Sequence, residues 1–245
     1  HAPKRLGRRE LPTDMPGETV TMSEIGSALY LIRTGIEQDV PETAGLLGSA
    51  VLPTSPLFGK RAFDLCIPGT PRYGAMVSLK DYPSRTRAGM LNELLSADFS
   101  FSLTQGFSYE NGRMNEAKLA FREVQMSNTG SRSETLSAGL KKLADDTSSN
   151  RTTTGMHNFA LAVFSPRLDD LDRHVGSAMT AITRFGGANP VKERNVWWSG
   201  GMEPQYWALL PGVTWTHCRS GQITTLNLAH MASLEGFASG SARGY

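Results

Sequence analysis

The sequence of 245 residues is 39% apolar and 20% charged, which is typical of a globular protein with one large domain or two small ones. Its 25 Lys and Arg residues and 23 Asp and Glu residues leave a net charge of +2, so no field over the whole chain indicates nucleic acid or an anionic membrane as a partner. No run of about 18 apolar residues occurs, and we expect neither a membrane-spanning helix nor a signal peptide.

The two cysteines and the two ends of the chain suggest a cytoplasmic fragment. Cys66 and Cys218 lie far apart, and neither has a second thiol at the spacing of a metal site, which favours a reducing, cytoplasmic setting. Residue 1 is His rather than Met, and residues 238–245 form a tail rich in Gly and Ser that is typical of a linker. We therefore expect this chain to be part of a longer protein.

The first part of the chain contains one clear helical pattern. Thr21 and Glu24 stand at the spacing of a capping box, in which a hydroxyl and a carboxylate satisfy free backbone N–H groups at a helix start. Apolar residues follow at helical intervals, and Gly35 provides a stop. The pattern predicts a helix over residues 22–34.

The remainder of residues 1–72 is irregular. Proline and glycine are frequent after the helix and flank two short apolar runs, at residues 50–52 and 62–67. Such runs between turn residues suggest small strands at the edge of the main body. We expect residues 1–72 to form an irregular N-terminal subdomain with a helix and short edge strands.

Residues 73–197 show the succession of strands and helices expected of a packed core. The clearest strand covers residues 99–109, where large apolar residues alternate with Ser, Thr and Gly, so that one face is buried and the other largely polar. Before it, the patterns predict a strand at 73–82 and a helix that begins at Thr86 after Pro83. After it, they predict one long helix or a helical hairpin over 111–147 and a buried strand at 159–164. A helix from Leu168 to Phe185 follows, which Gly186 and Gly187 end, and then a strand from Pro190 to Val196.

This order predicts an α+β fold with a ferredoxin-like β-α-β-α-β-α-β core and a mixed or antiparallel sheet. The N-terminal subdomain would precede it. We expect a core over residues 73–197, then a Trp-rich segment over residues 198–237 and a linker tail over residues 238–245.

Nucleotide-binding loops are not indicated. A Walker phosphate loop needs a glycine five places before its Gly-Lys pair, because its backbone amides wrap a phosphate, but Thr54 stands there before Gly59 and Lys60. Gly186 and Gly187 follow a helical pattern instead of a strand, which excludes a dinucleotide fingerprint and predicts a helix stop. We expect no cofactor site in this chain.

Thiol and imidazole groups give a weak alternative. His217, Cys218 and His230 are the only such groups near one another, and a zinc site would need a further ligand at short spacing. A small enzyme that uses Cys66 or Cys218 as a nucleophile with a distant histidine base stays open, although the apolar neighbours of Cys66 favour a packed thiol.

An acidic run has a structural interpretation. Asp169, Asp170 and Asp172 fall at the predicted start of a helix, and we place all three in its first turn, where carboxylates suit the helix dipole.

A basic run lies near the start of the chain, at Lys4, Arg5, Arg8 and Arg9. These residues are the best electrostatic candidates for contact with DNA or lipid headgroups. Four charges beside a chain end are more often a solvated tail, which is the interpretation we favour.

Large aromatic residues gather late in the chain. All four tryptophans fall within nineteen residues, around prolines and glycines. The cluster comprises Trp197, Trp198, Tyr206, Trp207 and Trp215. Such rings either fill a core or anchor a partner, and we favour the core.

Four stretches of the sequence bear a family resemblance. They are EIGSALYLIRTG, DYPSRTRAGMLNELLSADFSFSLTQGFSY, SNRTTTGMHNFALAVFSPRLDDL and MEPQYWALLPGVTWTHCRSGQITTLNLAHMASLEGF. In this order they resemble the N-terminal region of the CagE/TrbE family, the large ATPases of type IV secretion and conjugal transfer systems. The second is the most specific, since the family usually has EYPxxTRPGMLNxLLS followed by FxxxLTQSF at the same spacing. The fourth is similar to the family's YWAQLPGN and ITSxNFA sequences.

The sequence departs from the family pattern at four places. Ala88 stands where proline is usual, Leu209 for glutamine, Val213 for asparagine and Leu228 for phenylalanine. The differences concern the subfamily, because the resemblance extends over nearly the whole chain from Thr21 onward.

The resemblance implies a function for the parent protein. It would hydrolyse ATP at the cytoplasmic face of the bacterial inner membrane and drive pilus assembly or the transfer of protein or DNA. In the family the domain that binds ATP and Mg begins soon after this point of the sequence. This chain would then be a non-catalytic part that docks on inner-membrane components of the secretion system, on its own C-terminal ATPase domain and on copies of itself in a homo-oligomer. A nucleic-acid-contacting domain of a conjugation motor is the alternative.

No catalytic, cofactor-binding or metal-binding residue of the family can be carried over to this chain. The resemblance carries over a signature that is a possible interface. Its residues are Tyr206, Trp207, Leu210, Pro211 and Gly212, together with Arg87, Gly89, Met90, Leu91 and Asn92. We interpret Pro211 and Gly212 as a turn that fixes where the chain leaves this domain, and Trp207 as its packed anchor.

Overall fold

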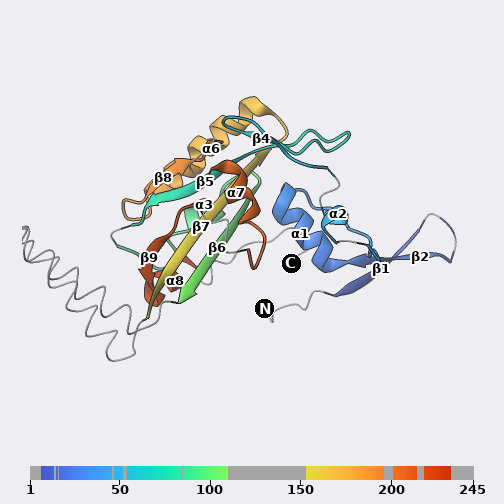
Figure 1. Ribbon diagram of the computed structural model, residues 1–245, viewed down its shortest axis with the longest axis horizontal. Helices are drawn as coiled ribbons and strands as arrows, with labels where there is room; N and C mark the ends of the chain where they lie inside the picture. Colours follow the sequence, from blue (N-terminus) through green and yellow to red (C-terminus); the bar gives the residue numbers. More distant parts are fainter. Residues whose placement is uncertain are drawn as a thin grey trace, which may run out of the picture.

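The computed structural model describes residues 7–13, 15, 17–45, 47–51, 54–83, 85–109, 153–195, 201–213 and 218–232 (Figure 1). Its strands are β1 (Arg8–Pro12), β2 (Thr19–Ser23), β3 (Leu57–Phe58), β4 (Phe63–Asp64), β5 (Tyr73–Asp81), β6 (Phe101–Tyr109), β7 (Thr154–Ser165), β8 (Asn189–Lys192) and β9 (Gly221–Thr224). Its helices are α1 (Glu24–Thr34), α2 (Leu47–Val51), α3 (Asn92–Leu95), α6 (Leu168–Thr183), α7 (Met202–Trp207) and α8 (Thr225–Met231).

The main body is a seven-stranded antiparallel sheet with the order β3-β4-β5-β7-β6. Two further pairings complete it, because β8 pairs with β5 and β9 pairs with β7. Strands β1 and β2 form a separate hairpin that lies beside α1, away from the main sheet (Figure 1). The structure is therefore an α+β fold with an antiparallel sheet, one of the two sheet types that the sequence predicts.

Strand β7 is the centre of the sheet. It pairs with β6 over its length, with β5 over its second half and with β9 at its start. All of its residues except Met156 are buried. A strand that is covered on both faces has a continuous apolar run rather than an alternation, which explains the unbroken sequence from Phe159 to Phe164.

Helices α6 and α3 cover one face of the sheet. The buried residues of α6 recur at helical spacing, at Leu171, Val175, Ala178 and Ile182, so one stripe of the helix faces the core. This stripe packs against the side chains that β5 and β7 direct to the same face. Those side chains are Ala75, Val77, Leu79, Phe159, Leu161 and Val163.

The opposite face is covered by two segments that are far apart in the sequence. Phe63 and Leu65, in and after β4, meet Tyr206 of α7 over the side chains that β5 and β7 direct to this face. These side chains are Met76, Ala160, Ala162 and Phe164. The sheet thus lies between two layers, and its central strands are closed to water on both sides.

Helix α1 is fixed to the sheet at its C-terminal end. Gly35 caps it in the left-handed conformation, with φ 64°, and its N–H donates to the Leu31 carbonyl at 2.8 Å. The Arg72 guanidinium donates to the carbonyl oxygens of Thr34 at 3.1 Å and Gly35 at 2.6 Å. A cation at this place satisfies the last carbonyls of the helix and suits its dipole. The predicted stop at Gly35 is confirmed.

Two predictions for the N-terminal subdomain are wrong. The N-cap of α1 is Ser23, whose Oγ accepts from the Gly26 N–H at 3.1 Å. Thr21 does not cap the helix, because it pairs with Glu10 in the β1–β2 hairpin and is still extended. The run at residues 50–52 does not form a strand, since Val51 ends helix α2 and packs in a small cluster with Tyr30 of α1.

Several boundaries in the core differ from the predicted ones. Strand β7 begins at residue 154 and not at 159, β6 begins at 101 and not at 99, and α6 ends at 183 and not at 185. The helix expected from Thr86 begins only at Asn92, because Gly89 has φ 71° and its carbonyl accepts from the Asn92 N–H at 3.0 Å, which makes a turn where the helix was expected. Strand β8 ends at Lys192, and Val196 lies outside the described residues. The predicted glycine stop after α6 is confirmed, because Gly186 and Gly187 follow this helix with φ values of 61° and 81°.

The ferredoxin-like order stays a prediction. The helix or hairpin that it expects over 111–147 lies outside the described residues, as does the tail over 238–245. The described strands add β3, β4 and β9 to the four that the prediction contains. The domain boundaries also stay a prediction, and β4 and β5 pair across residue 72.

Replacing Gly35 by Ala tests how α1 is fixed to the sheet. A Cβ atom there would lie 2.5 Å from the Phe164 ring, in a backbone conformation that disfavours any side chain. We expect a loss of about 2–5 kcal/mol in the free energy of unfolding, measured by urea titration, from strain and overpacking together. Gly69→Ala is the control, because Gly69 has φ 72° in open space. It should cost about 1–2 kcal/mol, and equal losses would show that the contact with Phe164 is unimportant.

Candidate docking surface

The first half of the family signature reaches the core through Tyr206, whereas Trp207 and Leu210 are half-buried and Pro211 and Gly212 are exposed. Tyr206 is fully buried, and its ring lies 4.8 Å from that of Phe63 and 5.6 Å from that of Phe58, between ring centroids. Its hydroxyl donates to the Arg33 carbonyl at 3.2 Å, and burial raises the pKa of Tyr206, which keeps the hydroxyl protonated. The side chain therefore joins α7, the β3–β4 hairpin and α1.

Tyr206 and Trp207 also hold a buried cation. The guanidinium carbon of Arg33 lies 4.6 Å from the centre of the Tyr206 ring and 4.4 Å from that of Trp207. Arg33 is 4% exposed, and its Nε and Nη2 atoms have no hydrogen-bond partner among the described residues. Aromatic faces attract a cation electrostatically, so the two rings offset part of the free energy that the guanidinium loses when it is removed from water. This contact explains why two adjacent aromatic residues stand in the signature.

The signature ends in a turn. The Val213 N–H donates to the Leu210 carbonyl at 3.2 Å, and Gly212 between them has φ 84°. Proline at the second position and glycine at the third are typical of a type II turn, so Pro211 and Gly212 form a turn as the sequence predicts. The chain does not leave the domain there, because β9 follows the turn and pairs with β7. Thr104 of β6 donates to the Leu209 carbonyl at 2.9 Å, which attaches the turn to the edge of the sheet.

The second half of the signature lies on the other face of the sheet. Met90 and Leu91 are buried against α6, and Gly89 forms the turn before α3. Arg87 and Asn92 are exposed. Because Tyr206 belongs to the opposite core cluster, the structure does not bring the two halves of the signature together.

The thiol and imidazole candidates do not meet in a site. Cys218 donates to the Gly201 carbonyl at 3.4 Å, and burial raises the pKa of its thiol, which opposes a reactive thiolate. Cys66 lies in a turn in which its N–H donates to the Asp64 carboxylate at 2.8 Å. His230 contacts the Thr86 hydroxyl at 2.9 Å, and His217 lies outside the described residues. Within the described part of the chain, no three His, Cys, Asp or Glu side chains could hold a metal ion.

The basic run near the start is engaged within the N-terminal subdomain. Arg8 forms an ion pair with Glu42 at 2.5 Å, and Arg9 forms one with Asp39. Lys4 and Arg5 lie outside the described residues. Two of the four charges are thus partly neutralised by carboxylates of the chain, which reduces their attraction for phosphates.

The three aspartates at the start of α6 have two different roles. Asp169 and Asp170 stand in the first turn, as predicted. Asp172 does not, because it lies two residues after Asp170, beyond the first turn, and its carboxylate accepts from Lys192 of β8 at 2.6 Å. This hydrogen bond, with further attraction from Arg61, lowers the pKa of Asp172.

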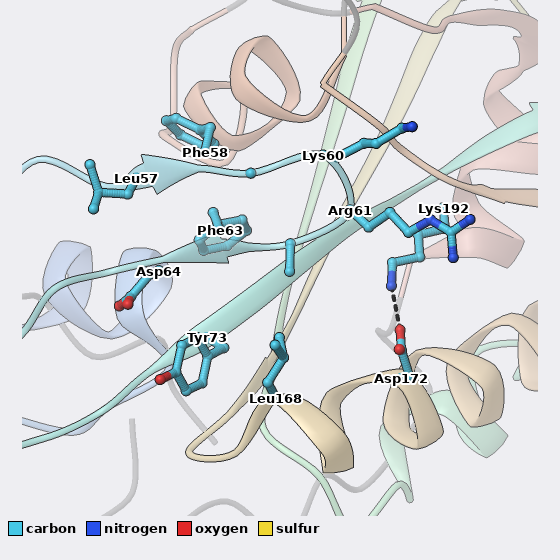
Figure 2. A pocket seen from close by; sticks show the side chains of 12 residues that line it. Leu57, Phe58, Lys60, Arg61, Phe63, Asp64, Tyr73, Leu168, Asp172 and Lys192 are labelled. Atoms are coloured by element: carbon cyan, nitrogen blue, oxygen red, sulfur yellow. Dashed lines mark hydrogen bonds and ion pairs between the residues drawn. The ribbon is translucent and has the colours of Figure 1, made fainter.

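Asp172 belongs to a groove that the sequence did not reveal. The groove has a volume of about 560 Å³ and lies between the β3–β4 hairpin and helix α6, beside the start of β5 (Figure 2). Its lining residues are Leu57, Phe58, Gly59, Lys60, Arg61, Ala62, Phe63, Asp64, Tyr73, Leu168, Asp172 and Lys192. We call it the hairpin groove.

The hairpin groove has an apolar end and a basic end. Figure 2 shows Leu57, Tyr73 and Leu168 on one side, together with the carboxylate of Asp64, and Lys60, Arg61, Lys192 and Asp172 on the other. Leu57 is 65% exposed and Leu168 is 52% exposed, so two large aliphatic side chains at this end remain in water. Exposed apolar side chains that gather beside a hollow mark a surface suited to binding another molecule.

The sequence contains only faint signals for this groove. Gly59 and Lys60 are the Gly-Lys pair that fails as a phosphate loop, and Leu57 follows a proline in an irregular segment. Neither feature tells that Leu168, more than a hundred residues later, lies across from them. The exposure of an aliphatic side chain depends on tertiary packing and has no local sequence pattern.

The fold is that of an α+β domain with an antiparallel sheet and a groove on its surface. The chain belongs to the CagE, TrbE, VirB family, component of type IV transporter system, whose model matches residues 13–219. The resemblance that the sequence indicated is therefore confirmed. No described helix has the length and apolar character needed to cross a membrane.

Several curated proteins are similar over almost the whole chain. Protein virB4 of Rhizobium radiobacter is 35% identical over 241 residues, which cover 98% of this chain and 29% of that protein. Type IV secretion system protein virB4 of Bartonella quintana is 31% identical, with coverages of 93% and 28%. Type IV secretion system protein PtlC of Bordetella pertussis is 27% identical, with coverages of 88% and 26%. This chain thus spans less than a third of the length of these relatives.

A double-mutant cycle tests the cation–π contact of the signature. Trp207→Leu keeps an apolar group but removes the aromatic face above Arg33. We expect it to reduce the free energy of unfolding by about 1–2 kcal/mol more in the wild-type chain than in an Arg33→Met background, as measured by urea titration. Equal losses in both backgrounds would mean that Trp207 acts through packing alone.

The pH dependence of Cys218 alkylation tests the enzyme alternative. Because burial raises the pKa of this thiol, its neutral form is favoured in the folded state, and the thiolate appears only above the ordinary pKa of cysteine. In a Cys66→Ser variant, the rate of reaction with iodoacetamide should still rise above about pH 8.5. A plateau below about pH 7.5 would instead indicate an activated nucleophile.

Proposed function

We propose that this chain is the non-catalytic docking and assembly domain of a type IV secretion ATPase. The observation that carries the proposal is the hairpin groove, in which Leu57 and Leu168 are exposed beside a basic end. Burying large aliphatic side chains of this kind against a partner is favourable, by roughly 25 cal/mol for each Å² removed from water. A domain that assembles with other proteins gives these side chains a role.

Family membership supports the same proposal. The relatives are type IV secretion system proteins, and this chain corresponds to less than a third of their length. We infer that ATP and Mg bind in the remaining part of the parent protein, which powers pilus biogenesis and the transfer of protein or DNA. The partners would be inner-membrane components of the same system, the parent's own C-terminal ATPase domain and further copies of the protein. The site of action would be the cytoplasmic face of the bacterial inner membrane.

Leu57→Asp in the full-length protein tests the docking function. A carboxylate on the apolar end of the hairpin groove opposes burial against a partner. At this exposed position its effect on folding is limited to repulsion from Asp64, the cross-strand neighbour of Leu57, which costs roughly 0.2–1 kcal/mol. We expect the amount of inner-membrane components of the secretion system that co-purify with the protein to fall at least about tenfold, as for a residue central to an interface. Substrate transfer between cells should fall with it.

Ile25→Asp is the matched control. Ile25 is also exposed, at 49%, but it lies in α1 and outside the hairpin groove. It should leave co-purification unchanged, and urea unfolding should show both variants to be folded. Wild-type co-purification and transfer with Leu57→Asp would refute the docking role of this groove.

A further inference from the structure

The two ends of the hairpin groove point to the chemistry of its occupant. We propose that the groove binds a segment of a partner protein in which apolar side chains are followed by acidic ones. The inference rests on the proposed docking function and adds the kind of partner. It follows from three features, namely the free cations, the apolar end and the carboxylates of the lining.

Among the described residues, the basic end contains two cations, Lys60 and Arg61, whose side chains form no hydrogen bond or ion pair, although Arg61 attracts the Asp172 carboxylate. Lys60 and Arg61 lie in the turn of the β3–β4 hairpin, which is closed by the Gly59 N–H donating to the Ala62 carbonyl at 2.9 Å. Neither side chain has an ion pair or hydrogen bond with another described residue. Lys192, by contrast, is 20% exposed and is engaged by Asp172. Lys60 and Arg61 are thus the charges available to a partner.

The lining as a whole has a net charge of +1. It contains the three cations Lys60, Arg61 and Lys192 against the two carboxylates Asp64 and Asp172. One carboxylate of a partner at the basic end would balance this charge, and Arg61 can bind a carboxylate through two parallel hydrogen bonds. Charge complementarity of this kind selects partners and speeds association.

The apolar end argues for a protein segment and against nucleic acid or lipid headgroups. A phosphodiester backbone or a row of phosphates would place negative charge along the groove, beside Leu57 and Leu168, which gain nothing from it. It would also come close to the carboxylate of Asp64, which lies on the side of Leu57 and repels phosphates, whereas Asp172 is paired with Lys192. An apolar stretch with acidic residues at one end satisfies both ends of the groove.

The hairpin turn is a suitable place for such cations. Its closing hydrogen bond and the β3–β4 pairing use backbone atoms, so the side chains of Lys60 and Arg61 are not needed for folding. Phe63 and Phe58 on either side of the turn pack against Tyr206 and hold the hairpin in place. The cations are therefore presented on a rigid support, which lowers the entropy lost on binding.

Three fluorescein-labelled peptides of equal length test the proposal with the full-length protein, by fluorescence anisotropy. The first has an apolar half of Leu and Phe and an acidic half of Glu. The second replaces every Glu by Lys, and the third replaces every Leu and Phe by Ser. We expect the first peptide to bind at least about tenfold more tightly than the other two, and its affinity to fall as salt is added.

Charge reversal at the turn gives the sharper readout. The double variant Lys60→Glu/Arg61→Glu should lose about tenfold or more in affinity for the first peptide and prefer the second, since the sign of the basic end is inverted. A variant that merely misfolds would bind neither. The matched control is Lys80→Glu/Arg85→Glu, which makes the same charge change at exposed residues outside the groove and should behave like wild type.

Other outcomes overturn the proposal in distinguishable ways. One such outcome is that phosphatidylglycerol vesicles or a single-stranded oligonucleotide bind the wild-type protein and lose affinity in Lys60→Glu/Arg61→Glu, while no peptide binds. In that case the occupant is a lipid or a nucleic acid. If Leu57→Asp blocks assembly but the first and second peptides bind equally, docking stands and the acidic partner is wrong. If Leu57→Asp leaves assembly unchanged and no peptide binds, both the docking function and this inference fail.

Discussion

Burial of strand β7 on both faces is the constraint on which the remaining structure depends. Its backbone groups must be paired by strands on either side, and its side chains must be covered by a layer above and a layer below. Strands β5 and β6 supply the pairing, and α6 covers one face. The other face needs both the β3–β4 hairpin and α7, which explains why segments more than a hundred residues apart form one core cluster. None of these layers can be removed without exposing the centre of the sheet.

This constraint changes how the family signature is understood. The aromatic pair of α7 closes the second face of the sheet and holds Arg33 of α1, so its identity follows from packing and from the electrostatics of a buried cation. Met90 and Leu91 serve the first face in the same way. The signature therefore reports how the layers are joined. The hairpin groove, which we propose as the docking surface, is formed by residues outside the signature. The role of the exposed signature residues as an interface stays a prediction.

The sequence predicted the elements whose signal is local and missed those that depend on tertiary contacts. The alternation in β6, the apolar stripe of α6 and the glycine stop of α1 each fix an element from its own residues. The helix expected from Thr86 failed, because Gly89 adopts a left-handed conformation in a stretch that otherwise suits a helix. The groove was not predictable, because Leu57, Asp172 and Lys192 come from three elements that only the folded sheet brings together.

The position of the hairpin groove depends on two strands, β4 and β8, that pair with the same edge of β5. Strand β4 pairs with the start of β5, at Tyr73 and Gly74, whereas β8 pairs with its second half, from Val77 onward. The edge thus changes partner within a few residues. The Asn195 N–H, just after β8, donates to the Lys60 carbonyl at 3.3 Å, so the turn of the hairpin stays joined to the chain that leaves β8. The hairpin groove lies beside this change of partner, where side chains of the hairpin, β5, β8 and α6 line it. The position of the proposed docking surface therefore follows from the sheet topology.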